Sequence, residues 1–414
     1  MKVYFHTFGC KANQYDTEVI RQALVAAGAS PTDDPAAADV AVVNSCTVTH
    51  KGEAKMRGLV RRLHRRRPEI RTIVMGCAAA LDDGTIASLP GVTAVVGGSD
   101  PKAVLDAAGM DGPAIDPILR TFPRGARAWL KIQDGCDEHC TFCATTVARG
   151  DSRSRHPDEI LAEAQVLSES HEEIVHTGVH IGTYGRDLAP PHSLAALVER
   201  LLNAIRRTRF RLTSVEATEV DERLMDLMAT SPDRLAPHLH APLQSGSDAI
   251  LKRMGRHWYT ARSYRDRCEA LAERVPVLGL GADVIVGFPG ETDADHSATR
   301  ALIRDLPFTY LHVFPYSERP HASSARLGPP VDPRVVSGRA AELRKLASDK
   351  GAAHRARRSG GTADVVVLRR HQGVAQGLTE DYLDVQLSVL HAPGSRLATV
   401  LARDAEGRLF AEVA

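Results

Sequence analysis

The sequence predicts an α/β protein in three parts: an open parallel α/β sheet, a partial (β/α)6 barrel and a small all-β barrel. Apolar, β-branched runs separated by helical patterns fill residues 1–115, and six further strand-then-helix units follow in residues 122–355. From residue 360 to residue 414 the pattern changes to short strands with glycine turns. Strands that alternate with helices favour parallel sheets, whereas regularly spaced short strands favour a barrel.

The first two parts differ in the spacing of their strands. In the first part we expect strands at 2–8, 40–44, 72–76 and 92–97 and a helix at 16–27. A segment rich in Pro and Gly, residues 112–127, is predicted to be a linker. In the second part we expect strands at 129–133, 173–180, 210–216, 238–243, 279–287 and 309–315. Helices are expected at 157–170, 193–207, 221–230, 248–254, 261–274 and 294–305. Six such units fit an open barrel better than a complete eight-unit one.

The C-terminal part begins with a polar, Ala- and Arg-rich segment that we expect to be helical, residues 334–358. Short strands are then expected at 363–368, 381–387, 397–401 and 409–413. The strands are short and the turns contain glycine, so this part is predicted to be a small all-β barrel.

Composition restricts the class of protein. The 414 residues include 52 Lys+Arg and 51 Asp+Glu, a balance that argues against a uniformly basic nucleic-acid coat and against an acidic tail. No apolar run reaches the roughly 18–20 residues of a membrane helix, and the N-terminal segment lacks the apolar stretch of a signal peptide. We therefore expect a cytoplasmic protein with no membrane partner. Its seven cysteines are expected to serve metal or redox chemistry.

Three of these cysteines, Cys136, Cys140 and Cys143, stand within eight residues just after the first barrel strand. Soft thiolates select zinc or iron–sulfur clusters. A structural zinc site needs four protein ligands, and no fourth cysteine lies nearby. Three thiolates suit a [4Fe–4S] cluster with one open iron. The alternative is a zinc site completed by His139 or by a distant residue.

A second set of cysteines is dispersed along the chain. Cys10, Cys46 and Cys77 each follow a predicted strand of the first sheet. The carboxyl ends of parallel strands face one crevice, so we expect the three thiols to converge there and hold a second cluster. Each thiol taken alone is as consistent with a small buried side chain. Cys268 lies on an apolar helix face and is assigned to core packing.

These motifs resemble a known family. The spacing of Cys136, Cys140 and Cys143 is the signature of radical S-adenosylmethionine (SAM) enzymes. Residues 7–16 (TFGCKANQYD), 44–49 (NSCTVT), 242–247 (PLQSGS) and 283–292 (DVIVGFPGET) resemble the methylthiotransferases of that superfamily. The last fifty residues resemble TRAM, the small RNA-binding barrel of that family. The chain departs from the family pattern after Cys77 and after Cys143.

The resemblance is strongest to the subgroup of threonylcarbamoyladenosine tRNA methylthiotransferases. It is carried by Lys11, residues 176–182 (HTGVHIG) and residues 240–244 (HAPLQ). The isopentenyladenosine and ribosomal-protein enzymes of the family tend to carry Gln where Lys11 stands. The resemblance therefore implies insertion of a methylthio group at C2 of N6-threonylcarbamoyladenosine, at position 37 of tRNA.

The resemblance also implies the cofactors and partners. Two [4Fe–4S] clusters and two SAM molecules per turnover are expected, because no acid or base activates an aromatic C–H bond. One cluster would cleave SAM to a 5′-deoxyadenosyl radical, and the cluster of Cys10, Cys46 and Cys77 would hold the inserted sulfur. Partners would be the anticodon arm of tRNA, an electron donor such as flavodoxin or ferredoxin, and a sulfur source. Further SAM contacts are predicted at four polar or backbone positions after barrel strands: Thr177, Gly178, Glu216 and Gln244. No role is assigned to His176, His180, His238 or His240.

Two basic clusters are candidate RNA contacts. Nine basic and two acidic residues lie between positions 51 and 71, and such clusters neutralise phosphates. The predicted contacts are Arg61, Arg62, Arg65, Arg66, Arg355, Arg357 and Arg358. The alternative for each cluster is a solvated helix face.

Two other functions stay open. One keeps the family and changes the substrate, to isopentenyladenosine in tRNA or to a ribosomal-protein aspartate. The other is a non-catalytic RNA-binding protein stabilised by zinc at Cys136–Cys143.

Overall fold

The computed structural model describes residues 1–47, 50–123, 125–319, 321–371, 374–388, 391–404 and 406–412. Val48, Thr49, Arg124 and Val413, which belong to segments discussed above, lie outside the described residues. Within the described ranges, every helix is too short or too polar to cross a membrane.

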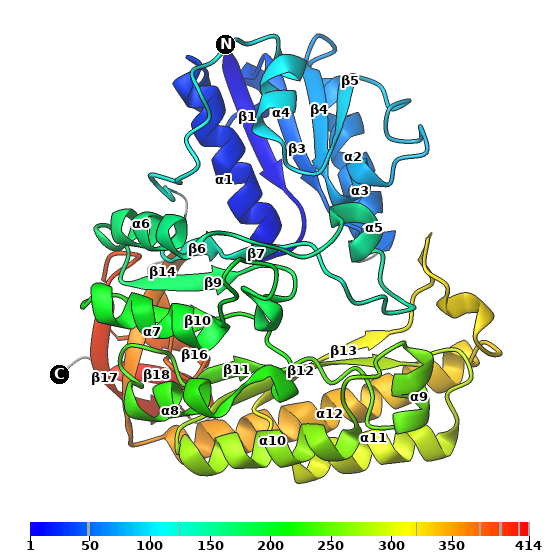
Figure 1. The fold of residues 1–414 in the computed structure, drawn as a ribbon, viewed down its shortest axis with the longest axis vertical. Coiled ribbons are helices and arrows are strands. Elements are labelled where there is room, and N and C mark those ends of the chain that lie inside the picture. Colours follow the sequence, from blue (N-terminus) through cyan, green and yellow to red (C-terminus); the bar gives the residue numbers. More distant parts are fainter. Residues whose placement is uncertain are drawn as a thin grey trace.

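The first part of the chain is a five-stranded parallel sheet with helices on both faces (Figure 1). Its order β2-β1-β3-β4-β5 is formed by β1 (Lys2–Thr7), β2 (Ser30–Thr32), β3 (Val40–Ser45), β4 (Arg71–Gly76) and β5 (Val92–Gly97). One apolar cluster joins α1 (Lys11–Ala26) and α4 (Pro101–Ala108) to the sheet, and a second joins α2 (His50–Arg66) and α3 (Cys77–Ala80) to its other face. The predicted open parallel sheet is confirmed. The three-residue β2 was not predicted, because it is too short to show a periodic pattern.

The central part is the predicted partial barrel. Two three-stranded parallel sheets, β6-β9-β10 and β11-β12-β13, are linked by a parallel bridge between Ser214 and His240. The strands are β6 (Ala128–Lys131), β9 (Glu173–Thr177), β10 (Arg209–Leu212), β11 (His238–His240), β12 (Gly279–Val286) and β13 (Tyr310–Pro315). The helices are α5 (Thr145–Arg149), α6 (Pro157–Ser168), α7 (Leu194–Ala204), α8 (Glu222–Thr230), α9 (Asp248–Arg253), α10 (Ala261–Arg274) and α11 (Asp293–Asp305). A two-stranded pair, β7 (Gln133–Asp134) and β8 (Arg153–Ser154), flanks the loop that carries α5.

Three of the predicted barrel strands were too long. Strands β9, β10 and β11 end three or four residues before the predicted ends at 180, 216 and 243. After each strand the chain leaves the sheet, and β9 and β10 are followed by short 3-10 turns. The 3-10 turns of the molecule are η1 (Pro35–Ala37), η2 (Ile181–Thr183), η3 (Ala217–Glu219) and η4 (Ser324–Arg326). The apolar residues beyond the strand ends pack as loops at the barrel mouth.

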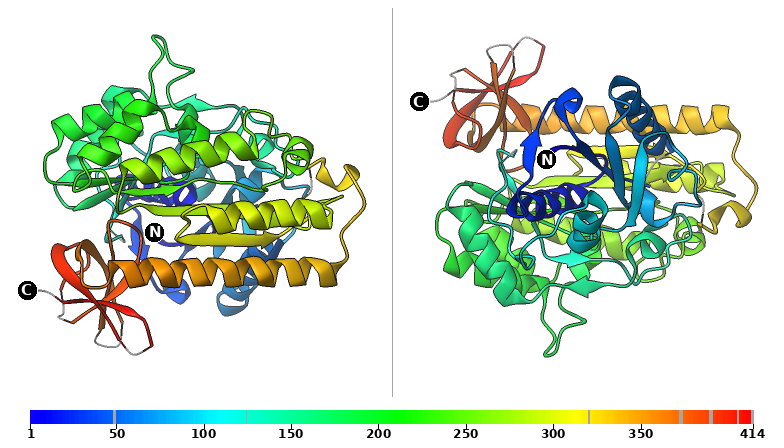
Figure 2. Two further views of the ribbon diagram at one scale, coloured as in Figure 1. Left: turned by 90° about the horizontal axis from the view of Figure 1, so that it is seen from below. Right: turned by 90° about the horizontal axis from the view of Figure 1, so that it is seen from above.

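The long helix α12 (Pro333–Arg358) leads to a closed five-stranded barrel (Figure 2). Its order β14-β15-β16-β18-β17 is formed by β14 (Thr362–His371), β15 (Val374–Leu378), β16 (Asp384–Leu387), β17 (Arg396–Arg403) and β18 (Leu409–Glu412). The predicted all-β barrel is confirmed. Strand β15 was missed, since its five residues, VAQGL, contain a glycine and a single β-branched side chain.

Arg358 joins α12 to this barrel and is buried. Its guanidinium lies 3.0 Å from Asp381 and 2.6 Å from Glu380, and it also donates to the carbonyl of Thr362. The prediction that Arg358 contacts RNA is therefore wrong: its side chain is enclosed by carboxylates of the barrel. Arg357 is exposed and Arg355 is half-buried, so both remain accessible to a ligand.

Arg358→Met is expected to loosen the C-terminal barrel, because it leaves Asp381 buried with one cationic partner fewer. Breaking a buried ion pair costs about 3 kcal/mol, which corresponds to roughly 100-fold faster local opening. Hydrogen–deuterium exchange of peptides from β14 and β15 measures this opening. Arg355→Met, on the same helix, should leave the exchange unchanged. Equal exchange in the two variants would contradict the assigned role of Arg358.

Candidate metal centre

Cys10, Cys46 and Cys77 lie at the carboxyl ends of three neighbouring strands, β1, β3 and β4, and meet around Asn13. The Cys10 thiol donates to Asn13 Oδ1 at 3.1 Å, and Asn13 Nδ2 lies 4.0 Å from Cys77 Sγ. Asn13 is fixed by Asn44: Asn13 Nδ2 donates to Asn44 Oδ1, and Asn44 Nδ2 donates to the backbone carbonyl of Asn13, both at 2.8 Å. The residue before Cys10 is Gly9 at φ +111°, where a Cβ would lie 2.9 Å from the Cβ of Cys46. The expected convergence is therefore present in the structure.

Arg149 connects this set of thiols to the second part of the chain. Its Nε donates to Cys77 Sγ at 3.2 Å, and its two terminal nitrogens bind Asp134 at 2.8 Å and Asp16 at 3.0 Å. Burial raises the pKa of the Cys77 thiol, and the Arg149 guanidinium opposes that rise. Arg149 belongs to α5, the helix that follows Cys143, so its side chain ties the loop of one cysteine set to Cys77 of the other. Sequence reasoning missed Arg149, because its partners lie far away in the chain.

Each thiol of the closely spaced set, Cys136, Cys140 and Cys143, accepts a hydrogen bond from an N–H group. The backbone amide of Glu138 lies 3.4 Å from Cys136 Sγ, and that of Thr145 lies 3.4 Å from Cys143 Sγ. Arg256 Nη1 lies 3.5 Å from Cys140 Sγ. Burial raises the pKa of Cys140 to about 12, and Arg256 opposes this rise. N–H groups directed at sulfur stabilise thiolates and tune the potential of the clusters that they bind.

Two glutamates hold the charged groups behind these thiols. Glu216 accepts from both Arg256 and Trp258, so its two oxygens are occupied. Glu219 lies 2.9 Å from His180 Nε2, and His180 Nδ1 lies 3.7 Å from Cys136 Sγ. Burial opposes protonation of His180, but Cys136 and Glu219 raise its pKa to about 10. His180, for which the sequence predicted no role, therefore lies between Glu219 and Cys136 and contacts both. Glu216 orients Arg256, and its contact with SAM stays a prediction.

The distances between the sulfur atoms distinguish a site for an iron–sulfur cluster from a site for a single zinc ion. A Zn–S bond of about 2.3 Å requires sulfurs within about 4.6 Å of one another. Among the described residues, the groups of three ligands whose atoms lie within 4.8 Å of one another contain no cysteine. His139, the alternative zinc ligand, is exposed. Both cysteine sets are therefore too open for one zinc ion, whereas a four-iron cluster binds each thiolate at a different corner. The donor sets fit the iron–sulfur expectation.

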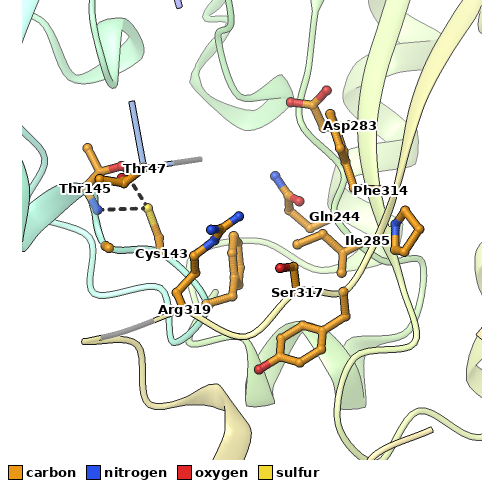
Figure 3. A pocket seen from close by; sticks show the side chains of 13 residues that line it. Thr47, Cys143, Thr145, Gln244, Asp283, Ile285, Phe314, Ser317 and Arg319 are labelled. Atoms are coloured by element: carbon orange, nitrogen blue, oxygen red, sulfur yellow. Dashed lines mark hydrogen bonds between the residues drawn. The ribbon is translucent and has the colours of Figure 1, made fainter. Parts of the chain in front are cut away.

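One cavity has Cys143 in its lining, together with Thr47, the neighbour of Cys46 in the chain (Figure 3). On one side lie Cys143, Thr145 and Thr47, which follows Cys46 in the chain, and on the other lie Gln244 and Asp283 of the barrel. The lining residues are Thr47, Phe142, Cys143, Ala144, Thr145, Gln244, Asp283, Ile285, Phe314, Pro315, Tyr316, Ser317 and Arg319. Gln244 has φ +61°, a left-handed conformation that is uncommon outside glycine. The cavity is the natural place for a small molecule and a substrate base to meet.

Thr177 and Gly178 lie at the carboxyl end of β9, outside the lining of this cavity. A Cβ on Gly178 would lie 2.6 Å from the carbonyl oxygen of Gln133. The Gln133 side chain accepts from the backbone amides of Val179 at 3.1 Å and His180 at 2.9 Å. Gln133 therefore locks the loop into one conformation. The SAM contacts of Thr177, Gly178 and Gln244 stay predictions.

His176 is buried in β9 and stacks on Phe210 at 5.2 Å, and no group of the described residues forms a hydrogen bond with either of its ring nitrogens. Burial lowers its pKa from 6.5 to about 4. The unfolded chain binds this proton more tightly, so the free energy of unfolding falls as the pH drops from about 6.5 towards 4.

His176→Phe is expected to remove this pH dependence. Between pH 8 and pH 5 the wild-type protein should lose about 2 kcal/mol of stability that the variant keeps. Urea unfolding of the anaerobic protein at both pH values measures the difference. The control His257→Gln, at an exposed imidazole, should behave as the wild type does. If the His176→Phe variant loses as much stability as the wild type between pH 8 and pH 5, then groups other than His176 cause the loss.

The predicted RNA contacts of α2 form an exposed basic surface. Arg61, Arg62, Arg65 and Arg66 are all exposed, and none has a carboxylate partner among the described residues. A groove beside them is lined by Gly58, Arg61, Arg62, His64, Arg65 and Pro90. Unpaired guanidiniums on one face are available to phosphates.

Two family models match the chain. The model described as "Uncharacterized protein family UPF0004" matches residues 2–98, and the radical SAM superfamily model matches residues 130–303. Among solved structures, the radical SAM methyltransferase TsrM from Kitasatospora setae superposes with a TM-score of 0.61. It is 14% identical and covers 78% of this chain and 76% of that chain. That likeness concerns the fold alone.

Similar curated proteins span most of the chain. The threonylcarbamoyladenosine tRNA methylthiotransferase MtaB of Bacillus subtilis is 39% identical, over 82% of this chain and 79% of that protein. The protein of the same name from Aquifex aeolicus is 32% identical, over 93% and 96%. The tRNA-2-methylthio-N(6)-dimethylallyladenosine synthase of Syntrophobacter fumaroxidans is 36% identical, over 84% and 80%. With both models matched and identity above 30% over most of its length, the chain belongs to the radical SAM methylthiotransferase family.

Proposed function

We propose that this protein is a tRNA methylthiotransferase that acts on N6-threonylcarbamoyladenosine at position 37 and uses two [4Fe–4S] clusters. The observation that carries the proposal is the pair of three-thiol sets, each with N–H donors on sulfur, with Cys143 of one set and Thr47, the neighbour of Cys46 of the other, lining one cavity. A reaction that removes a hydrogen atom and inserts sulfur at one carbon needs both functions within reach of one base.

The cysteines divide between these functions. Cys136, Cys140 and Cys143 would hold the cluster that binds SAM, and Cys10, Cys46 and Cys77 would hold the second. When bound, the first cluster supplies the electron that cleaves SAM and the second supplies the sulfur. Arg256 and Arg149 each place a cation against one sulfur of a set, at 3.5 Å and 3.2 Å. Such N–H groups favour the reduced state of a cluster, because they balance its added negative charge.

The surface supports an RNA substrate. The exposed arginines of α2 stand on the N-terminal part that also carries Cys46, and Arg355 and Arg357 precede the C-terminal barrel. These groups would neutralise phosphates of the anticodon arm, while the base at position 37 leaves the loop and enters the cavity. An electron donor and a sulfur source complete the expected partners.

Reconstitution with defined substrates tests the proposal. The anaerobically purified protein, loaded with iron and sulfide, is incubated with SAM, a reductant and tRNA that carries either threonylcarbamoyladenosine or isopentenyladenosine. Nucleoside mass spectrometry should detect a methylthio product from the first tRNA. If only the isopentenyladenosine tRNA yields a methylthio product, the substrate is isopentenyladenosine and not threonylcarbamoyladenosine.

A further inference from the structure

Lys11 is a half-buried cation, and among the described residues no anionic group pairs with it. It follows Cys10 directly and begins α1, and its ammonium lies 5.9 Å from the centre of the Trp129 ring. No described residue forms a hydrogen bond or an ion pair with that ammonium. Lysines withdrawn from solvent are normally paired, so a missing partner points to a ligand.

The surroundings of Lys11 carry a surplus of positive charge. Arg127, Arg209 and Arg211 all contact the one carboxylate of Glu173, at 3.2, 2.6 and 3.0 Å. Asp364 also contacts Arg209, at 3.0 Å, but it is shared with Arg396. Glu173 is fully buried, and the pKa of its carboxyl stays well below the usual value because of the arginines. The guanidiniums are therefore already engaged, and Lys11 adds a further cation that these carboxylates do not neutralise.

The barrel interior beside Lys11 is polar and leads to the cavity. The hydroxyl of Tyr310 lies 2.9 Å from His238 Nε2 and 3.0 Å from His240 Nδ1. The carboxylate of Asp283 lies 3.1 Å from His240 and 3.0 Å from His312, and Asp283 also lines the cavity described above. Lys11 and Arg127 both lie over the Trp129 ring, at 5.9 and 5.2 Å from its centre, and Arg127 in turn contacts Glu173 inside the barrel. The polar side chains of the barrel interior would hydrogen-bond a substituent that extends from a base in the cavity towards Lys11.

We propose that Lys11, beside the polar barrel interior that adjoins this cavity, binds the carboxylate of the N6 substituent of the substrate adenosine. The assignment rests on the proposed function and defines its substrate class as an adenosine with an anionic N6 chain. An apolar chain in the same place would leave Lys11 withdrawn from solvent and unpaired. Sites built to pair a polar group reject analogues that lack it far more strongly than apolar pockets reject a changed methylene.

Binding of modified RNA tests the proposal without catalysis. The probes are two fluorescent anticodon stem-loops, one with threonylcarbamoyladenosine at position 37 and one with its carboxylate converted to a carboxamide. The reconstituted wild-type protein should bind the carboxylate probe at least 10-fold more tightly. Lys11→Met should bind both probes equally, and Lys11→Arg should keep most of the preference. Iron and sulfide content, measured for each variant, shows whether the neighbouring Cys10 site is intact.

Lys55→Met is the matched control, because Lys55 is an exposed lysine of the basic helix α2. It should weaken binding of both probes alike and keep the preference for the carboxylate. Equal binding of the two probes by the wild-type protein, or a preference that survives in Lys11→Met, would overturn the role of Lys11. The proposed function would still stand if the wild-type protein methylthiolates the threonylcarbamoyladenosine tRNA. If the wild-type protein does not form this methylthiolated tRNA, the proposed function itself is wrong.

Discussion

A Cys140→Ala variant is expected to lose SAM cleavage, whereas a Cys46→Ala variant is expected to keep SAM cleavage and lose sulfur insertion. The two variants are expected to differ because the thiols form two sets. Only the set that contains Cys140 has the spacing typical of radical SAM enzymes. In each variant the affected product should fall below about 1% of the wild-type level, and bound iron should fall by about half. Chromatography of 5′-deoxyadenosine and of the modified nucleoside measures the two reactions separately.

The control for these variants is Cys268→Ala. Cys268 is 1% exposed and packs in the apolar core of the central part, as predicted, away from both thiol sets. This variant should keep both reactions and its full iron content. If Cys46→Ala still formed the methylthio nucleoside, the assignment of Cys10, Cys46 and Cys77 to the sulfur-supplying cluster would be wrong.

An Arg149→Gln variant is expected to lose roughly 10- to 100-fold in methylthiolation, the usual cost of removing a group that supports a metal ligand. The variant loses the cation 3.2 Å from Cys77 and leaves Asp16 and Asp134 with fewer partners. The reduction potential of the second cluster should fall, because a positive charge next to a thiolate stabilises the reduced state. Redox titration followed by electron paramagnetic resonance measures that potential apart from activity.

Arg149→Lys shows whether the charge or the shape of the guanidinium matters at position 149, and Arg200→Gln is the control. Arg149→Lys keeps the charge but lacks the planar fork that reaches three acceptors, so its activity should recover only in part. Arg200→Gln removes an exposed arginine, bound to Asp158, and should change neither potential nor activity. An unchanged potential in Arg149→Gln would show that Arg149 only holds the two parts of the chain together.

The meeting of Cys10, Cys46 and Cys77 was predictable, because the carboxyl ends of parallel strands lie at one edge of a sheet whatever the loops do. The order β2-β1-β3-β4-β5 reverses direction between β1 and β3, and Cys10 and Cys46 flank that point. The three closely spaced cysteines were predictable from spacing alone. Both arguments use backbone topology, which periodic patterns reveal.

The side chains around the thiols were not predictable in the same way. Arg256 reaches Cys140 across 116 positions of the chain, and Arg149 reaches Cys77 across 72. Nothing in the local pattern of either arginine distinguishes it from a surface residue. Arg358 illustrates the opposite error: it stands in an Arg-rich run, yet the barrel buries it against Asp381. Contacts between distant segments decide these roles, and a single sequence does not contain them.

Nucleoside mass spectrometry of bulk tRNA from a strain with the gene deleted and then restored tests the proposed function in the cell. We expect 2-methylthio-N6-threonylcarbamoyladenosine to disappear on deletion while its precursor without the methylthio group accumulates. The wild-type gene should restore the nucleoside, and a gene encoding Cys46→Ala should not. An unchanged level of this nucleoside in the deletion strain would contradict the proposed function.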